Sequence, residues 1–300
     1  LKQHDVIEDF VNQESFLDTE NMFARIVKWT LAIELIGFIL IFFLLEPVGI
    51  FESTPDRIFQ AAFHSISGFC NAGLSIMPGG MMNELVVSNY AFHVVILILF
   101  FLGGFGMIYL FDLFEVKRLR ERMKYPWKRI QFGTKISLYF TLGLLLAGAA
   151  IFFVFEYDNT LADRSGFGGV VTAFFESMTT RNAGFNTVET SDFSLPVLVF
   201  FLFLMFIGAG SGSAGGGIRV STFGVMVASV ISTIRRKPHI ELFNRTLENE
   251  LVLKAYSIFV FFIVGNLVGI FVLLVTEQAA IESGHFTLMD IIFEHVSAAS

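Results

Sequence analysis

Charged residues and cysteine are both scarce in this chain. Asp, Glu, Lys and Arg make up 16% of its 300 residues, whereas a typical soluble domain has about 25%. Cys70 is the single cysteine, which excludes an internal disulfide framework and a cysteine-rich metal site. The histidines at positions 64, 93, 285 and 295 have no shared spacing that suggests a metal site. Because no nucleophile, base and orienting residue form a catalytic set either, we predict no enzyme and no cofactor.

Apolar residues are abundant instead, at 54% of the chain with 38 Phe. This composition predicts an all-α protein that crosses a membrane several times. Most of the long apolar runs are close to the about 20 residues that a spanning helix needs; they cover residues 27–45, 91–111, 135–155, 195–227 and 253–276. Three shorter apolar segments cover residues 58–69, 169–179 and 287–299. We expect these to be short helices that enter the membrane and return.

A repeated phrase follows two of the short segments. Residues 62–74 read AFHSISGFCNAGL, and residues 173–185 read AFFESMTTRNAGF. A third copy begins at residues 293–300, on a register that would place its glycine two positions beyond Ser300. A short helix and a glycine turn between two spans is the layout of a cation pore element, because a loop at membrane depth must be buried or line a wet cavity.

The Asn-Ala-Gly turns are the predicted ion-coordinating site. Backbone carbonyls can replace the water around a cation, glycine permits the backbone angles that aim them at one axis, and the C-terminal end of a short helix favours positive charge. The predicted site residues are Cys70, Asn71, Ala72, Gly73, Arg181, Asn182, Ala183 and Gly184, with Ser300 from the third copy. Glu176 and Glu294 occupy equivalent positions and either add negative potential at the outer mouth or bond backbone groups behind the turns. His64 reads as a hydrogen-bonded structural residue.

Glycines also interrupt the overlong fourth run, at Gly208, Gly210, Gly212, Gly215, Gly216 and Gly217. Each glycine costs about 1 kcal/mol relative to alanine inside a helix, so we expect a break here. We interpret the segment as a loop that can block or open the ion path. A close-packing helix surface is the alternative. Arg219, at its end, would hinder cations or anchor the next helix. In residues 102–107 (LGGFGM), the glycines should let neighbouring helices approach closely.

The charge pattern gives an orientation. Basic residues lie at positions 25 and 28, along 117–129 and along 235–245, whereas the intervening loops are acidic. Because cytoplasmic loops are enriched in Lys and Arg, these basic segments should be cytoplasmic, and every span then alternates if the short segments return. The 117–129 run either marks topology and contacts lipid headgroups or docks a cytoplasmic partner.

These motifs together make the chain resemble the Trk/Ktr/HKT superfamily of potassium transporters and channels. The resemblance rests on residues 69–73 (FCNAG), 180–187 (TRNAGFNT), 212–219 (GSAGGGIR) and 102–106 (LGGFG). It implies four span–pore helix–span repeats around one pore. The segments would be a cytoplasmic amphipathic stretch at 1–26, the second repeat at 27–116 with its filter at 70–74, a basic loop at 117–133, the third repeat at 134–234 with its filter at 181–185 and gate at 208–217, a cytoplasmic loop at 235–252, and part of the fourth repeat at 253–300.

The resemblance also implies a function and partners. Potassium would be the transported substrate, the protein would sit in the plasma (inner) membrane among its lipids, and bacterial members form homodimers on cytosolic nucleotide-binding regulatory subunits of the TrkA/KtrA kind. Nothing suggests binding to nucleic acid. The chain begins with Leu1 and stops at Ser300 inside a predicted helix, so we expect both ends to be cut.

Three alternatives remain open at this point. One is a sodium-selective or poorly selective cation transporter of the same architecture. Another is a membrane-embedded lipid enzyme with Asp112 and Glu115 at a headgroup site, although no clustered acidic or metal-binding motif supports it. The last is a non-transporting scaffold, which the presence of both visible glycines, Gly73 and Gly184, argues against.

Overall fold

The computed structural model describes residues 19–46, 53–125, 130–181, 184–213, 215–237, 239–243, 245–284 and 286–299. Nearly all of the regular structure is helical. The helices are α2 (Thr19–Leu44), α3 (Thr54–Phe69), α4 (Tyr90–Phe105), α5 (Met107–Phe114), α6 (Val116–Lys124), α7 (Phe132–Phe155), α8 (Gly166–Thr179), α9 (Leu195–Phe206), α10 (Val220–Ile234), α11 (Asn249–Thr276), α12 (Gln278–Glu282) and α13 (Leu288–Ala299). One antiparallel hairpin joins β1 (Glu241–Leu242) to β2 (Arg245–Thr246).

Within the described residues, three helices are long and apolar enough to cross a membrane singly: Met22–Leu44, Phe132–Phe155 and Asn249–Thr276. The other two predicted spans are broken. The predicted 195–227 run forms α9 and α10 with an irregular segment between them, as expected from its glycines. The predicted 1–26 segment is described only from Thr19, where it already belongs to α2.

The 91–111 span, which the sequence suggested as one helix, bends by 102° between α4 and α5. Gly106 makes the bend with φ 97° and ψ 135°, backbone angles that residues with a Cβ rarely adopt. A Cβ there would also collide with the carbonyl oxygen of Ser211. The predicted span at 91–111 therefore consists of two helices that meet at a bend. Hydropathy alone does not register a turn made within an apolar run.

The short helices sit between longer ones in three hairpin-like groups. α3 packs against α2 and α4, α8 against α7 and α4, and α13 against α11 and α9. Each short helix begins with a hydroxyl cap: Ser53 Oγ accepts from Asp56 N–H, Ser165 Oγ from Gly168 N–H, and Thr287 Oγ1 from Asp290 N–H. Such side chains satisfy amide groups that a helix start leaves unpaired. The three predicted short helices are thus confirmed as helices.

Serines tie two of the short helices to the preceding long helix. Ser65 Oγ donates to the carbonyl of Glu34 in α2 at 2.7 Å, and Ser177 Oγ donates to the carbonyl of Leu145 in α7 at 2.9 Å. The sequence register pairs Ser65 with Glu176 instead, so the two anchors lie one residue out of register.

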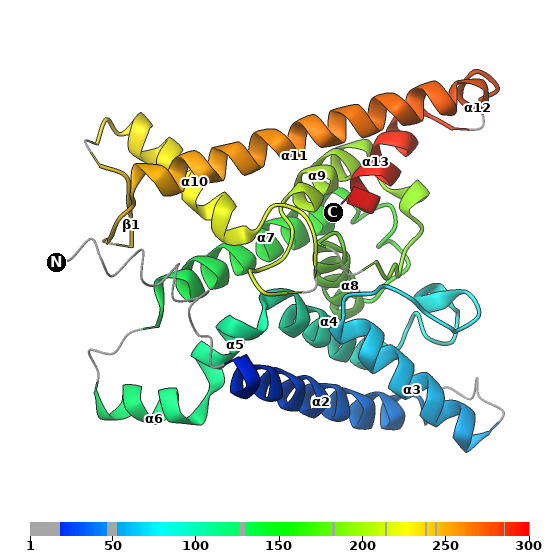
Figure 1. The fold of residues 1–300 in the computed structure, drawn as a ribbon. Coiled ribbons are helices and arrows are strands. Elements are labelled where there is room, and N and C mark those ends of the chain that lie inside the picture. The colour runs from blue at the N-terminus through cyan, green and yellow to red at the C-terminus, as the bar shows by residue number, and fades with distance from the viewer. Residues whose placement is uncertain are drawn as a thin grey trace.

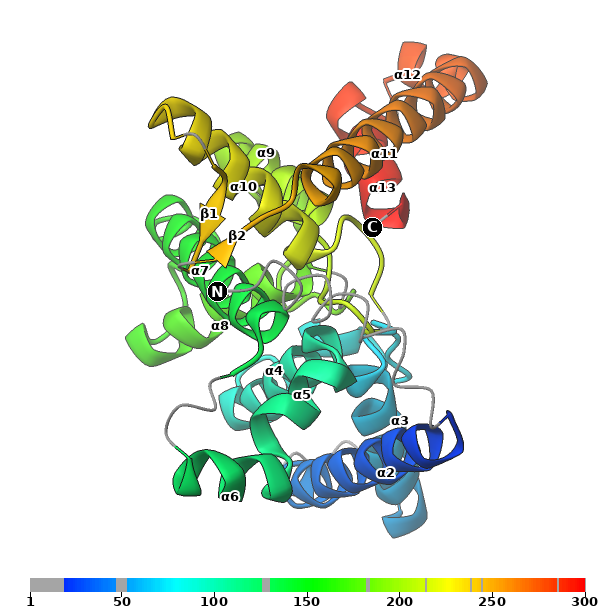
Figure 2. The ribbon, with the colours of Figure 1, turned by 60° about the vertical axis from the view of Figure 1, so that its left-hand side comes forward.

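Figures 1 and 2 place α2 and α3 at one edge of the molecule and α11 at the opposite edge. The irregular segment between α9 and α10, residues 207–219, lies centrally between these two edges in both views. Large apolar side chains on the outer helices are exposed, including Phe261 and Phe271 on α11. Because lipid tails accept such surfaces, exposure along a spanning helix is what a membrane protein requires.

Candidate functional site

The glycines that end the two Asn-Ala-Gly motifs lie against each other. α3 ends at Phe69 and α8 ends at Thr179. After each helix the backbone passes through a glycine of positive φ, 66° at Gly73 and 74° at Gly184. A Cβ on Gly184 would stand 3.0 Å from Gly73 Cα. Asn182, Ala183 and Ser300, three of the predicted site residues, lie outside the described residues.

Hydroxyl groups hold the residues that follow each glycine. Ser67 Oγ donates to the carbonyl of Leu74 at 2.8 Å and accepts from its N–H at 3.1 Å. Thr179 Oγ1 donates to the carbonyl of Phe185 at 2.6 Å. Phe185 also stacks on Phe100 of α4 with ring centroids 5.3 Å apart. Each turn is therefore fixed to its own short helix, and the second turn also packs on the surrounding core.

Glu176 and Glu294, equivalent in the sequence register, do different things. Glu176 is 1% exposed, and its Oε1 accepts from the N–H of Thr187 at 2.9 Å and from its hydroxyl at 2.7 Å. For Glu176, the structure thus favours the reading in which the carboxylate bonds backbone behind the turn. Glu294 is exposed and lines the cavity described next.

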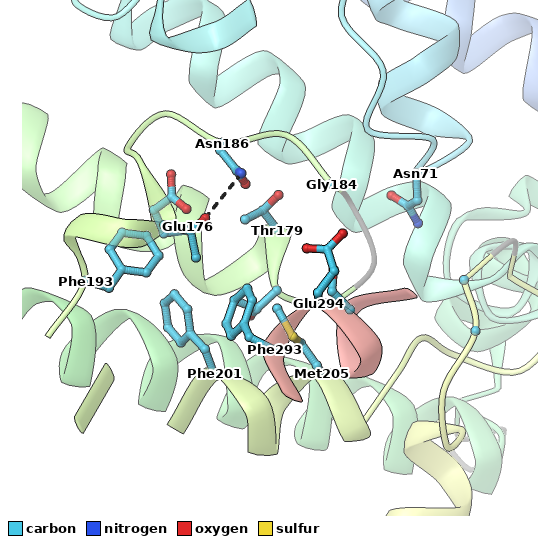
Figure 3. A pocket seen from close by; sticks show the side chains of 15 residues that line it. Asn71, Glu176, Thr179, Gly184, Asn186, Phe193, Phe201, Met205, Phe293 and Glu294 are labelled. Atoms are coloured by element: carbon cyan, nitrogen blue, oxygen red, sulfur yellow. Dashed lines mark hydrogen bonds between the residues drawn. The ribbon is translucent and has the colours of Figure 1, made fainter. Parts of the chain in front are cut away.

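A cavity of about 440 Å³ joins the predicted site elements. Figure 3 shows Asn71 and Gly184, from the two turns, on the same cavity as Thr179 of α8 and Glu294 of α13. The remaining lining residues come from the 207–219 segment, α9 and nearby elements: Glu176, Thr180, Asn186, Thr190, Phe193, Phe201, Met205, Gly215, Gly216, Phe293 and Ser297. One space therefore contacts both turns, the glycine-rich segment and the third short helix.

The glycine-rich segment 207–219 folds back on itself and docks on the α4–α5 bend. Ile207 and Ile218 form an isolated bridge. The N–H of Gly210 donates to the carbonyl of Gly104 at 2.8 Å. The guanidinium of Arg219 donates to the carbonyl of Gly215 at 2.6 Å and to that of Gly210 at 3.3 Å. Arg219 therefore holds the loop's own backbone, a contact that sequence reasoning did not foresee.

Asn71 and Arg181 anchor their turns to the broken helices. In the orientation that gives both its nitrogen and its oxygen a partner, the side-chain amide of Asn71 donates to the carbonyl of Phe100 at 3.3 Å and accepts from the N–H of Gly104 at 3.0 Å. A regular helix would join that carbonyl and N–H directly. Arg181 donates to the carbonyls of Ile207, Gly208 and Thr141 at 3.4, 3.0 and 3.4 Å. Both side chains thus reach backbone rather than another side chain.

The close-approach reading of LGGFGM is confirmed in detail. A Cβ on Gly103 would collide with the carbonyl oxygen of Phe69, at the end of α3. The helix end that leads into the first turn therefore approaches the backbone of α4 directly.

His64 is also structural, as expected: its ring nitrogens lie 2.8 Å from the carbonyl of Gln60 and 2.8 Å from Ser75 Oγ. Across the described ranges, no cluster of three or more His, Cys, Asp or Glu could hold a metal ion.

At the opposite end of α5, Asp112 organises the basic segment. It is 2% exposed, and its carboxylate binds Arg118 at 3.0 Å, Arg122 at 2.6 Å and the N–H of Gln131 at 3.0 Å. Glu115 pairs with Arg25 at 3.4 Å. Two arginines of the 117–129 run therefore contact Asp112, and both acids are paired with arginines, which disfavours the lipid-headgroup site considered as an alternative.

Comparisons with known proteins agree with this architecture. The family model TrkH, described as cation transport protein, matches residues 1–300. The chain is 32% identical over 304 residues to Ktr system potassium uptake protein B of Vibrio alginolyticus, which covers 99% of this chain and 62% of that protein. It is 28% identical over 280 residues to the potassium/sodium uptake protein NtpJ of Enterococcus hirae, covering 93% of this chain and 59% of the relative.

A solved structure shares the fold. The crystal structure of the potassium transporter TrkH from Vibrio parahaemolyticus matches with a TM-score of 0.63 at 20% identity, over 84% of this chain and 52% of that one. The chain spans about three fifths of the length of the relatives from Vibrio alginolyticus and Enterococcus hirae. These relatives are named as transporters and not as enzymes. The resemblance inferred from the motifs is confirmed, and this chain belongs to the TrkH family of cation transport proteins, integral membrane proteins built from helices.

Proposed function

We propose that this chain forms the greater part of the membrane subunit of a potassium uptake system. Ions would shed water at backbone carbonyls around Cys70–Gly73 and Arg181–Gly184 and then pass the 208–217 loop. The observation that supports this best is the cavity of about 440 Å³ that contacts Asn71, Gly184, Gly215 and Gly216 at once. A filter and a gate on one path have to share such a space.

The local electrostatics favour a cation. The C-terminal ends of α3 and α8 lead into the two turns, and a helix C-terminus carries a partial negative charge of about half a unit. Glu294 adds a carboxylate to the cavity lining. Inward movement of a cation gains about 2.3 kcal/mol per 100 mV of inside-negative potential. Uptake by such a path therefore needs no chemical step.

A sodium-selective or non-selective transporter is the second candidate. The name of the relative from Enterococcus hirae includes both potassium and sodium, whereas that from Vibrio alginolyticus names potassium alone. Potassium is our proposal because the greater identity is to the latter, and because both turns keep their glycine. Only the ratio of fluxes separates the two candidates.

The proposal extends to membrane orientation and assembly. The basic loops would face the cytoplasm of a plasma membrane and the short helices would enter from outside, with the second, third and part of the fourth repeat at the boundaries given above. One relative is named as protein B of a system, which supports an assembly of several subunits. We expect a homodimer and a nucleotide-binding cytosolic regulatory subunit, for which the outward-facing basic residues of α6 would be a docking surface.

The test is ion flux through the full-length protein in lipid vesicles, measured separately for potassium and sodium. We expect potassium to move faster. Gly210→Ala, which would place a methyl group against the carbonyl oxygen of Phe105, should change the flux while leaving the potassium-to-sodium ratio unchanged. If Gly210→Ala instead changed the potassium-to-sodium ratio and left the flux unchanged, the loop would not be the gate.

A further inference from the structure

Within the described part of the chain, the buried Arg181 side chain is held by backbone carbonyls. It is 3% exposed, and its three hydrogen bonds go to the carbonyls of Ile207, Gly208 and Thr141. Among the residues that the structure describes, no carboxylate forms an ion pair with it. Burying a guanidinium is costly unless its donors are satisfied, so this placement requires the three carbonyls to stay where they are.

The three carbonyls belong to two different elements. Ile207 and Gly208 begin the 207–219 loop directly after α9, whereas Thr141 lies inside α7. The planar guanidinium presents its donors in a fixed fork, and it therefore fixes the base of the loop against α7. Because Arg181 itself follows the end of α8, the same side chain also ties the loop to the second turn.

A second connection reaches the same loop from the first turn. Asn71 accepts from the N–H of Gly104, and the carbonyl of Gly104 accepts from the N–H of Gly210. One residue of α4, Gly104, thus stands between turn and loop. The loop residue that it binds, Gly210, lies only two residues beyond Gly208, whose carbonyl Arg181 holds. The loop is attached to both turns through backbone groups, once directly and once through α4.

Arg219 binds the same loop as Arg181, but its structural role is different. Its contacts, Gly210, Ser213 and Gly215, all lie within the loop. It fixes the loop's shape, but none of these bonds fixes where the loop stands relative to the turns. That position depends on Arg181 and on the Gly104 connection.

We infer that Arg181 is a positioning residue of the permeation path: its guanidinium clamps the base of the 207–219 loop to the second turn, so that turn and loop move as one body. This inference rests on the proposed function only in calling the turn a filter and the loop a gate. Arg181 would then serve the ion path through its side chain as well as its backbone carbonyl, and loosening it would free the gate while leaving ion choice intact.

The test compares Arg181→Gln and Arg181→Lys in the full-length protein with a matched control, Arg164→Gln. Arg164 is less buried than Arg181 but also binds backbone near the second turn, at the carbonyl of Thr187. Its side chain also contacts Thr172 and not the loop. Two readouts are needed. Hydrogen exchange followed by mass spectrometry reports on the 207–219 peptide, and vesicle flux reports on potassium and sodium.

Gln has one amide in place of the guanidinium fork, so it cannot reach both elements. A hydrogen bond from a charged donor contributes enough that losing one shifts an opening equilibrium about tenfold. We expect exchange in residues 207–219 and basal potassium flux each to rise about tenfold in Arg181→Gln, with Arg181→Lys intermediate. Arg164→Gln should leave the loop's exchange rate unchanged, and the potassium-to-sodium ratio should hold in all three.

The two readouts separate the inference from the function. If loop exchange rises in Arg181→Gln while the wild-type protein conducts no potassium, the clamp stands and the proposed function fails. If Arg164→Gln and Arg181→Gln change loop exchange equally, or if neither Arg181 variant changes it, the clamp is wrong. Should Arg181→Gln not fold, Arg181→Lys must still show faster loop exchange than wild type, and an unchanged rate would overturn the inference.

Discussion

Gly184 lies against Gly73, close enough that a Cβ added to Gly184 would stand 3.0 Å from Gly73 Cα. The two residues belong to different copies of the repeated phrase, and each has a positive φ. A side chain at Gly184 would therefore press on the first turn. Their meeting is the geometric basis for treating the two turns as parts of one site.

Gly184→Ala should impair the site in two ways. A left-handed backbone costs about 1–2 kcal/mol for a residue with a Cβ, and the new methyl group would push on Gly73. We expect weaker potassium-dependent thermal stabilisation of the full-length protein and a lower potassium-to-sodium flux ratio. Gly143→Ala in α7, where nothing lies within 4 Å of the added Cβ, is the matched control and should change neither. Wild-type selectivity in Gly184→Ala would contradict the shared-site interpretation.

Glu176→Ala should destabilise the protein, because it removes the acceptor for both the N–H and the hydroxyl of Thr187. Leaving such buried donors unpaired costs about 1–3 kcal/mol each, which thermal unfolding can measure. Glu294→Ala, at the equivalent position but exposed to the cavity, should instead lower ion flux with little change in the unfolding temperature. Equal effects of the two variants on unfolding would mean that their different surroundings do not matter.

Asp112→Ala should be among the most damaging changes at the end of α5 that carries the basic segment. Removing one partner of a buried ion pair costs about 3–5 kcal/mol, and here two arginines and the N–H of Gln131 lose their acceptor. The expected result is a markedly lower unfolding temperature. Glu250→Ala, which breaks an exposed pair with Lys254, serves as the control and should have no measurable effect. A wild-type unfolding temperature in Asp112→Ala would show that α6 is held by other contacts.

The sequence was sufficient to predict the features that depend on composition and order. The glycines after Phe206 predicted the break between α9 and α10, and the repeated phrase located two of the short helices. The residues just before all three short helices carried a further signal that was not used: Ser53, Ser165 and Thr287 each stand at a helix start as a hydroxyl cap.

Other features could not be predicted, because they depend on which backbone groups meet. The bend at Gly106 arises where the carbonyl of Ser211 occupies the space of a side chain, and nothing in residues 91–111 records that neighbour. The partners of Arg181 and Arg219 are mostly carbonyls. Every residue has a carbonyl, so a sequence pattern cannot say which ones an arginine will find.

The bend at Gly106 leaves α4 too short to cross a bilayer by itself. α4 has 16 residues, which corresponds to about 24 Å of helix, and α9 is shorter still, with 12 residues. Even standing upright, neither would match a hydrocarbon core of about 30 Å. Hydrophobic mismatch of this kind is relieved by local thinning of the membrane, so lipid next to these two helices should be compressed. A cation that crosses the membrane next to α4 and α9 would then face a narrower dielectric barrier than one crossing an undisturbed bilayer.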